Sequence, residues 1–203
     1  MKPSLLLFSI LILFYFSSAS KVPHSVLDTA RNTLRTSLYY YIFPADTISP
    51  DRGGGLAVGG IGNELCPLTV IQRKIYLEDG LPLQFFPFNH KRGVVRLSTD
   101  LNIQFAFPDS CNQTMVWKLE DYDISTGKYF VGVNGTAGKP GQKSLANWFK
   151  IEPFGRDYKL RYCPSVCKFC KVICKGVGLV IDQNGKRRLA LSDVPYKIVF
   201  RQA

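Results

Sequence analysis

The arrangement of apolar residues limits the fold of this chain more than any other feature of its sequence. In residues 101–107 (LNIQFAF) large apolar side chains alternate with polar or small ones, and residues 39–43 (YYYIF) are aromatic and β-branched. Because successive side chains of a strand point to opposite faces of a sheet, both patterns are typical of β-strands. No segment has a sustained helical repeat, so we predict an all-β chain.

About a dozen short strands are expected, separated by turn signals. Asn184-Gly185, between the apolar segments 179–181 and 187–191, is a strong hairpin signal because both residues tolerate the left-handed backbone of a two-residue turn. With 203 residues and 46% hydrophobic content, the chain can bury a core, and we expect one domain with a closed or capped β architecture. Further strands are expected at 68–73, 83–86, 94–97, 115–119, 129–133, 148–151, 158–162 and 197–200.

Residues 1–20 (MKPSLLLFSILILFYFSSAS) are interpreted as a cleaved signal peptide. Lys2 precedes an apolar run, residues 5–16, that is too short to span a membrane, and the small residues 17–20 offer a cleavage site. No second apolar run of that length follows. We therefore expect a secreted mature domain of residues 21–203.

An even number of cysteines in an exported chain indicates disulfides. Six cysteines allow 15 pairings, and the sequence alone does not choose among them. The first two are isolated and could pair with each other, whereas the last four are spaced symmetrically, so that a nested pair of disulfides would staple a hairpin tip. A four-cysteine zinc site is the alternative, but structural zinc sites usually combine two cysteine pairs across a longer loop, and we expect no metal. The six are Cys66, Cys111, Cys163, Cys167, Cys170 and Cys174.

Residues that enzymes need are scarce in this chain. Its two histidines are His24, near the start of the mature protein, and His90 in a polar turn, and neither has a nucleophile partner that the sequence reveals. The glycines at 53–55 lack the lysine and helix of a phosphate-binding loop. Acidic pairs at 78–79 and at 121 and 123 fit solvated turns better than a glycosidase pair. We therefore predict that the chain is not an enzyme and uses no cofactor.

The chain is strongly basic, with 26 Lys and Arg against 15 Asp and Glu and a formal net charge of +11. Basic residues gather at 73–74, at 91–92, at 168–175 and at 186–188. Nucleic-acid binding would need aromatic residues interleaved with such a stripe, or a known module, and neither is visible. We expect a solvated basic surface with weak attraction to acidic polymers, and no nucleic-acid or membrane partner.

One polar loop, residues 87–96 (PFNHKRGVVR), lies between two apolar strands and presents consecutive basic side chains. A serine protease with an acidic specificity pocket takes Lys or Arg at the residue before the cleaved bond, the P1 residue. An inhibitor uses the same attraction with a rigid loop, because preorganisation lowers the entropy cost of binding. An ordinary charged β-turn is the alternative interpretation.

The chain resembles plant Kunitz-type (soybean trypsin inhibitor-like) proteins over essentially the whole mature sequence, in order. The segment 163–174 and the ending 187–193 (RRLALSD) are similar to the miraculin-like branch of that family. The other matching motifs are 26–29 (VLDT), 34–36 (LRT), 40–42 (YYI), 53–56 (GGGL), 66–72 (CPLTVIQ), 98–103 (STDLNI), 147–151 (NWFKI) and 158–160 (YKL).

The resemblance implies a β-trefoil, a six-stranded barrel capped by three hairpins, with three disulfides. It implies a secreted inhibitor of trypsin-like serine endopeptidases in plant defence, located in the extracellular space or apoplast, or in the vacuole. The implied disulfides are Cys66–Cys111, Cys163–Cys174 and Cys167–Cys170. They leave no cysteine for an interchain bridge, so we expect a monomer.

The family's reactive loop, which inserts into the protease like a substrate, falls on residues 89–94. We expect P1 to be Lys91, then Arg92, with His90 a weaker option. The other loop residues are Asn89, Gly93 and Val94.

The chain also departs from the soybean-type pattern. Thr36 takes the place of the asparagine that braces the reactive loop, and its single hydroxyl cannot make the same hydrogen bonds. Arg31 and Ser37 replace two glycines, and Gly93 adds backbone freedom just past the expected P1 residue. A non-inhibitory, miraculin-like defence or storage protein is therefore the main alternative, and carbohydrate or cell-wall binding is a further one.

Two sequons, Asn112-Gln113-Thr114 and Asn134-Gly135-Thr136, fall in turn-like stretches. In a secreted protein both are predicted glycosylation sites, with an unused sequon as the alternative at each.

Overall fold

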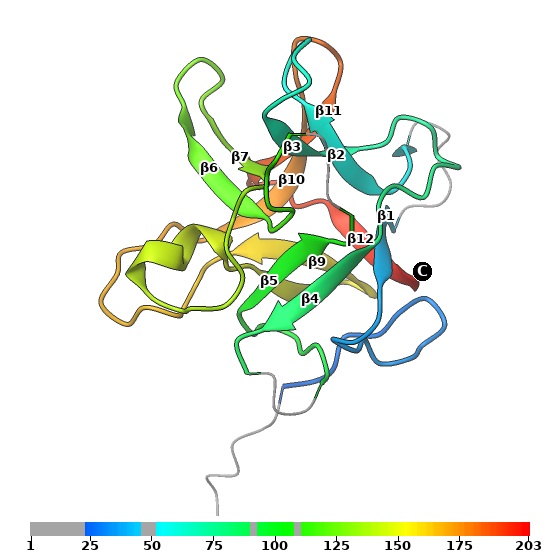
Figure 1. The fold of residues 1–203 in the computed structure, drawn as a ribbon. Helices are drawn as coiled ribbons and strands as arrows, with labels where there is room; N and C mark the ends of the chain where they lie inside the picture. Colours follow the sequence, from blue (N-terminus) through cyan, green and yellow to red (C-terminus); the bar gives the residue numbers. More distant parts are fainter. Residues whose placement is uncertain (1–22, 46–51, 90–92, 108–110) are drawn as a thin grey trace, which may run out of the picture.

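The computed structural model describes residues 23–45, 52–89, 93–107 and 111–203, so the expected signal peptide lies outside the described part (Figure 1). Within it the chain forms twelve strands in one antiparallel network and a short 3-10 helix, η2 (Gln142–Asn147). The strands are β1 (Tyr40–Pro44), β2 (Leu56–Gly60), β3 (Leu68–Gln72), β4 (Leu83–Pro87), β5 (Leu101–Phe105), β6 (Lys118–Asp123), β7 (Lys128–Gly132), β8 (Lys150–Phe154), β9 (Asp157–Tyr162), β10 (Lys175–Ile181), β11 (Arg187–Ser192) and β12 (Lys197–Gln202).

Six of these strands close into a ring. β4 pairs with β1 and β5, β12 pairs with β1 and β9, and β9 pairs with β8. A bridge between Leu101 and Phe149, with both backbone hydrogen bonds at 2.9 Å, joins β5 to the start of β8 and completes the ring. Closure leaves no unpaired edge along this barrel.

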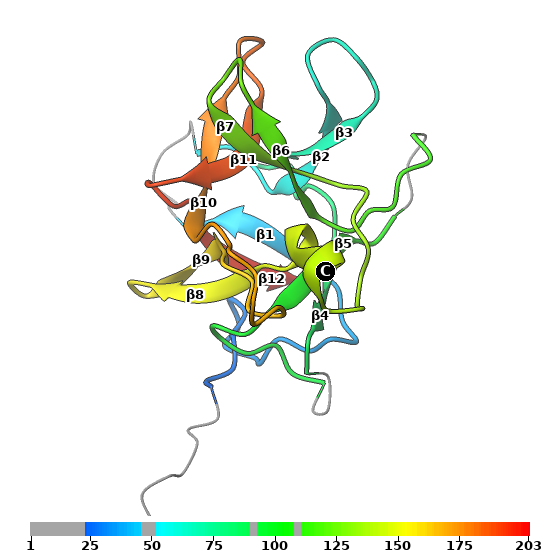
Figure 2. The same ribbon diagram turned by 90° about the vertical axis from the view of Figure 1, so that its left-hand side faces the viewer.

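The other six strands form three hairpins, β2–β3, β6–β7 and β10–β11, which cover one end of the barrel (Figures 1 and 2). Each hairpin pairs with both others, through β3–β7, β7–β11 and β3–β11. A six-stranded barrel with three mutually paired hairpins is a β-trefoil, so the predicted fold class is confirmed.

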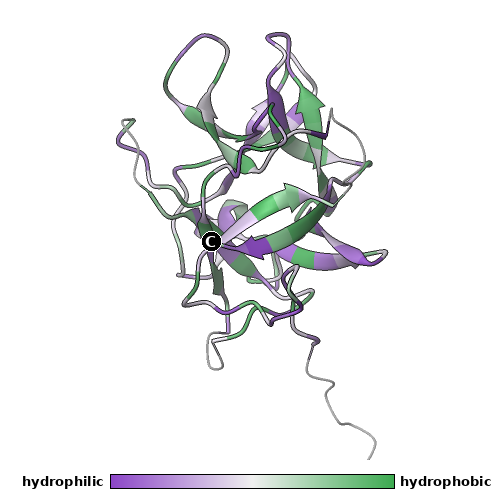
Figure 3. Cartoon of the chain, turned by 90° about the vertical axis from the view of Figure 1, so that its right-hand side faces the viewer, coloured by the Kyte–Doolittle hydropathy of each residue, from purple (hydrophilic) through white to green (hydrophobic). Residues whose placement is uncertain are grey.

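The barrel strands β1 and β4 bury alternate residues, as strands with one face in a core do. In both β1 and β4 the first, third and fifth residues are buried, which places Tyr40, Ile42 and Phe85 inside. Aromatic side chains meet there edge to face, as Phe85 does with Phe200 at 5.5 Å between ring centroids. Figure 3 shows apolar and polar residues interspersed along the strands.

The predicted strand at 94–97 is absent as such. Val94 and Arg96 instead make single antiparallel bridges with Arg35 and Ser25. The partner segment, residues 25–35, is itself not a regular strand, so no continuous pairing forms. β2 was not among the predicted strands, because its sequence LAVGG lacks the usual β-branched and aromatic pattern. Its last glycine is required by packing, since a Cβ on Gly60 would lie 1.8 Å from the Glu64 carbonyl oxygen.

Candidate functional site

The loop between β4 and β5 is the candidate site, and the structure describes both of its ends. Asn89 is exposed on the first side, and Gly93 and Val94 are partly buried on the second. His90, Lys91 and Arg92 lie outside the described residues. The structure therefore describes the two stems that flank the expected contact residues.

The second stem is held by the N-terminal segment of the mature chain. The amide of Thr36 donates to the Gly93 carbonyl at 3.0 Å, and Val94 bridges to Arg35. Val95 is fully buried, and its amide donates to the Leu34 carbonyl at 2.9 Å. Backbone bonds of this kind fix the direction in which the chain leaves the loop.

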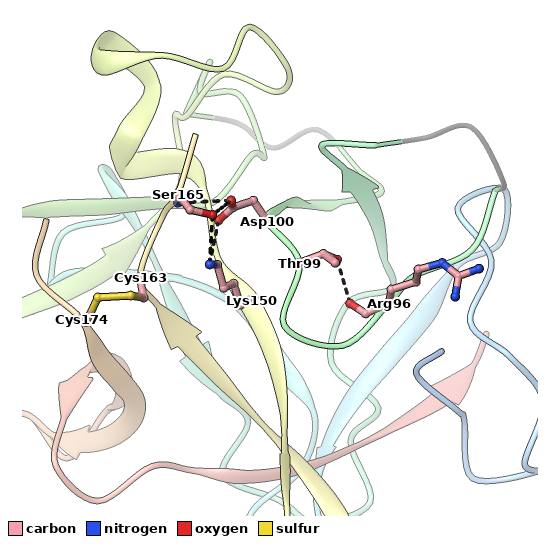
Figure 4. A network of polar contacts seen from close by, with 7 residues as sticks. All are labelled: Arg96, Thr99, Asp100, Lys150, Cys163, Ser165 and Cys174. Atoms are coloured by element: carbon pink, nitrogen blue, oxygen red, sulfur yellow. Dashed lines mark hydrogen bonds and ion pairs between the residues drawn. A yellow bond between two sulfur atoms is a disulfide. The ribbon is translucent and has the colours of Figure 1, made fainter. Parts of the chain in front are cut away.

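A further contact on this stem comes from Arg96. Its guanidinium donates to the Pro23 carbonyl at 2.7 Å, while the amide of Leu97 donates to the His24 carbonyl at 2.9 Å. His24 is exposed, and its contact with this stem is made by its backbone carbonyl. The hydroxyl of Thr99 donates to the Arg96 carbonyl at 2.9 Å and closes the turn that leads into β5 (Figure 4).

Of the residues that depart from the soybean-type pattern, Thr36 lies against this stem at Gly93. Thr36 meets Gly93 through its backbone, and its Oγ1 lies 3.8 Å from where a Cβ on Gly93 would be. Gly93 has a φ of 59°, a left-handed conformation that glycine adopts without strain. Arg31, which replaces a glycine, also has a positive φ of 66°, so the turn keeps its shape at some cost in strain.

The first stem is held at Phe88. Its amide donates to the Asp100 carbonyl at 2.8 Å, which pins the residue after β4 to the residue before β5. Its ring, 52% exposed as a residue, packs edge-on against the buried Trp148 at 6.1 Å between centroids. Trp148 in turn donates from Nε1 to the Ser144 hydroxyl of η2 at 3.2 Å.

A buried carboxylate ties the base of the loop to the disulfide-bonded segment. Asp100 is 7% exposed and accepts hydrogen bonds from the amide and the hydroxyl of Ser165. The ammonium of Lys150 lies 3.7 Å from the Asp100 carboxylate and donates to the Ser165 hydroxyl at 3.1 Å. Figure 4 shows these three side chains pointing toward one another beside the Cys163–Cys174 disulfide. A buried acid so paired holds its neighbours in one arrangement, because separation would leave charge without partners.

Sequence reasoning missed this network. Asp100 precedes β5, Lys150 begins β8 and Ser165 lies in the β9–β10 loop, so no local sequence pattern connects the three. Asp100 belongs to the motif 98–103 that carries the resemblance, but nothing in the motif indicates a partner. Only the barrel, which brings β5, β8 and the β9–β10 loop together, shows what the side chain does.

The disulfides in the structure are Cys66–Cys111, Cys163–Cys174 and Cys167–Cys170. These are the pairs that the resemblance implies, and they use all six cysteines. Two of them lie in the β9–β10 loop that carries Ser165. The bracing partner of Asp100 is therefore itself held by a covalent staple.

The predicted glycosylation sites are adjacent in space. Asn112 and Asn134 are both exposed, with positive φ values of 54° and 75°. Thr114 of the first sequon hydrogen-bonds the second, since its hydroxyl donates to the Gly135 carbonyl at 2.5 Å and its carbonyl accepts from the Asn134 amide at 2.7 Å.

In the described part of the chain, no group of three or more His, Cys, Asp and Glu residues could hold a metal ion. Among those same residues no helix is long and apolar enough to cross a membrane.

Comparison with known proteins matches residues 26–202 to the Kunitz-type family described as trypsin and protease inhibitor. Kunitz trypsin inhibitor 5 of Arabidopsis thaliana is 45% identical over 178 residues, which cover 88% of this chain and 85% of that protein. Miraculin of Synsepalum dulcificum is 47% identical over 193 residues, 92% of this chain and 86% of that protein.

Solved structures give the same result at the level of the fold. The Kunitz-type cysteine protease inhibitor PCPI-3 from potato has a TM-score of 0.75 at 33% identity, covering 90% of this chain and 98% of that one. Soybean trypsin inhibitor has a TM-score of 0.72 at 24% identity, covering 89% and 100%.

Proposed function

Because this chain belongs to the Kunitz-type family of trypsin and protease inhibitors, whose members are inhibitors rather than enzymes, we propose that it inhibits a trypsin-like serine endopeptidase. The inhibitory element is the β4–β5 loop, residues 89–94, which enters the protease as a substrate would. Lys91, or else Arg92, is the P1 residue and pairs with an acidic group in the specificity pocket.

The observation that carries this proposal is the anchoring of both stems by backbone hydrogen bonds. On one side Phe88 is bonded to Asp100, and on the other Gly93 is bonded to Thr36. Stems that are already ordered lower the entropy lost on binding. They also keep the two chain ends together if the peptide bond after P1 is cut, so the cut loop remains in the protease and hydrolysis goes slowly to completion.

The predicted signal peptide and the three disulfides support this function. A chain that enters the secretory pathway forms stable disulfides, and a protease inhibitor outside the cell meets the enzymes of attacking organisms. We therefore place the mature protein, residues 21–203, in the extracellular space or apoplast, acting in defence as a monomer.

A titration of trypsin with the purified, oxidised mature protein tests the proposal, followed by mass spectrometry of the recovered chain. We expect stoichiometric inhibition, with slow cleavage only after Lys91 or Arg92. The variant Lys91→Ala with Arg92→Ala should lose inhibition. The variant Lys168→Ala with Lys171→Ala removes the same charge from another exposed loop and should keep it. Rapid cleavage within 89–94 without inhibition would overturn the proposal.

The second candidate is a miraculin-like protein without inhibitory activity. It is favoured by the 47% identity to miraculin and by Gly93, whose left-handed backbone adjoins the expected P1 residue without a side chain to restrict it. In that case trypsin is not inhibited at equimolar protein, and neither is papain, which tests the cysteine-protease class represented by the potato structure.

A further inference from the structure

Two basic clusters that are far apart in the sequence meet in one groove. Arg73 and Lys74 begin the β3–β4 loop, Lys186 ends the β10–β11 turn and Arg187 begins β11. All four line a groove of 440 Å³ together with Glu78 and Asn184. Figures 1 and 2 show the β10–β11 turn at the far end of the molecule from the stems of the β4–β5 loop, so this groove is separate from the proposed inhibitory site.

The turn on one side of the groove is fixed by Asp182. Its carboxylate accepts hydrogen bonds from the amides of Asn184 and Lys186, both at 2.9 Å. Its backbone amide donates to the Lys186 carbonyl and its carbonyl accepts from the Gly185 amide, again at 2.9 Å. This acid is therefore satisfied within the turn, and the turn holds Lys186 and Arg187 in place.

The ammonium of Lys186 is held by two hydrogen bonds and has a third N–H donor. It donates to the Gly60 carbonyl at 2.8 Å and to the Gly62 carbonyl at 2.5 Å. An ammonium has three N–H donors, so two carbonyls leave the third for a ligand in the groove. Because both partners are neutral, the positive charge is not cancelled.

The guanidinium of Arg187 is positioned in a similar way. Its Nη1 donates to Gln72 Oε1 at 3.3 Å. Gln72 is buried and its amide nitrogen donates to the Tyr196 hydroxyl at 2.7 Å and to the Gly54 carbonyl at 3.1 Å. Within the described part of the chain, this hydrogen bond engages one of the five N–H donors of Arg187. A guanidinium fork matches the two oxygens of a carboxylate.

The opposite wall is also ordered through its backbone. Arg73 exchanges hydrogen bonds with two glycines, since its carbonyl accepts from Gly54 at 2.8 Å and its amide donates to the Gly55 carbonyl at 3.0 Å. Its side chain lies 3.9 Å from Glu78, and both side chains are more than 40% exposed, so the pair is weak. Four cations against one lining carboxylate leave the groove with a surplus of positive charge.

We propose that this groove binds an oligosaccharide of uronic acids, the carboxylated sugars of acidic plant polysaccharides. Arg187 and Lys186 take a carboxylate, Arg73 and Lys74 take the next one, and the Asn184 amide reaches sugar hydroxyls. Ile75, 56% exposed in the same wall, offers an apolar contact for the carbon face of a ring. The groove has a volume in the range of small-molecule sites. None of its lining residues is aromatic, whereas single-stranded nucleic acids require stacking platforms.

The test is a calorimetric titration of the mature protein with an oligomer of galacturonic acid, at physiological ionic strength. The variant Arg73→Gln with Lys74→Gln removes two cations for which, among the described residues, the weak Arg73–Glu78 pair is the one side-chain hydrogen bond or ion pair. We expect roughly tenfold or greater weakening, since each lost charge-assisted hydrogen bond weakens binding by about that factor. The matched control is Lys168→Gln with Lys171→Gln, which removes the same charge elsewhere and should bind within about twofold of the parent protein.

The outcomes separate uronate recognition from general attraction to polyanions. A fully methyl-esterified oligomer has the same rings without the charge and should not bind. Equal weakening by the control variant, or equal binding of a sulfated glycan or single-stranded DNA, would overturn the proposal. So would an absence of binding by the parent protein. Trypsin inhibition by the Arg73→Gln, Lys74→Gln variant should be unchanged, so the two proposals fail or succeed independently.

Discussion

At the scale of single residues, a few buried polar side chains determine how the loops are held. Asp100 joins the base of the β4–β5 loop to Ser165, and Arg188 joins the three capping hairpins. Arg188 is 5% exposed and its guanidinium lies 3.7 Å from the centroid of the Phe130 ring on β7. It also donates to Thr69 Oγ1 of β3 at 3.2 Å and to Glu120 of β6 at 3.3 Å. In each case one charged group organises segments that are distant in sequence.

The first prediction concerns Asp100. Replacing it with Ala leaves the Ser165 amide and the largely buried ammonium of Lys150 without their shared acceptor. We expect the free energy of unfolding to fall by about 2–4 kcal/mol, because a buried charge loses its partner. We also expect faster trypsin cleavage within residues 89–94, since one stem is released. Urea unfolding and timed mass spectrometry measure the two effects.

The control for Asp100 is Asp193→Ala. Asp193 pairs with Lys175 at 3.0 Å, but its side chain is 83% exposed, and such pairs contribute about 0–1 kcal/mol. A similar small loss for Asp100→Ala would mean that the network does not brace the loop.

The second prediction concerns Glu120. Burial raises the pKa of this carboxyl, and the charge of Arg188 only partly opposes the rise. The folded state therefore binds the proton more tightly than the unfolded state, whose glutamate pKa is about 4.3. As the pH rises from about 4.3 through the raised pKa, the free energy of unfolding should fall on account of this group. Glu120→Gln should remove that slope, which urea unfolding at a series of pH values would reveal. An unchanged slope would contradict the prediction.

At the scale of elements, regular strands could be predicted from the sequence and irregular ones could not. β1 could be predicted from its aromatic and β-branched residues, and β5 from its alternation of apolar and polar side chains, because both patterns suit a strand with one buried face. β2 could not, because its two glycines carry no strand pattern and reflect close packing against Ile71 and Glu64. β6 begins at Lys118, later than the predicted 115–119, and its register shifts between Leu119 and Tyr122, a local irregularity that depends on the partner strand.

The candidate site also has features that the sequence predicts and features that it does not. Its position in the chain and its basic character could be predicted from residues 87–96 alone. Its bracing could not, because the partners of Phe88, Gly93 and Asp100 come from the N-terminal segment and from η2, β8 and the β9–β10 loop. These contacts join segments that are distant in the sequence and meet only when the barrel forms, so the local sequence pattern around the loop does not predict them.

The third prediction concerns how much each disulfide stabilises the fold. Cys66–Cys111 spans 45 residues of sequence, whereas Cys167–Cys170 spans 3. Cross-linking a longer loop removes more entropy from the unfolded chain, about 4 kcal/mol for the first pair against about 2 kcal/mol for the second. Replacing both cysteines of a pair with Ser should therefore lower the free energy of unfolding more for Cys66–Cys111. Guanidinium unfolding of the two double variants gives the order, and a reversed order would show that native packing outweighs chain entropy.

At the scale of the whole molecule, the pairing of the first strand with the last holds the barrel closed. β12 pairs with β1 at five positions and with β9 at Lys197 and Ile198. Phe200 is fully buried, and its ring lies 5.5 Å from that of Phe85 and 5.6 Å from that of Tyr158. Its carbonyl also accepts from the Thr29 amide at 2.8 Å in the segment that supports the candidate loop. The last strand thus connects the fold to the site.

The fourth prediction follows from this closure. A chain that ends at Tyr196 lacks β12, so β1 and β9 lose their shared neighbour and the ring opens. We expect no cooperative thermal unfolding and no near-ultraviolet circular dichroism from this chain.

Two controls separate loss of the strand from smaller changes. Phe200→Ala keeps the strand and should fold, with a free energy of unfolding lower by about 3–5 kcal/mol. A chain that ends at Gln202 loses only the terminal Ala203 and should match the parent protein. Cooperative unfolding of the chain that ends at Tyr196 would mean that the barrel does not depend on its last strand, and trypsin inhibition by that chain would separate the candidate loop from barrel closure.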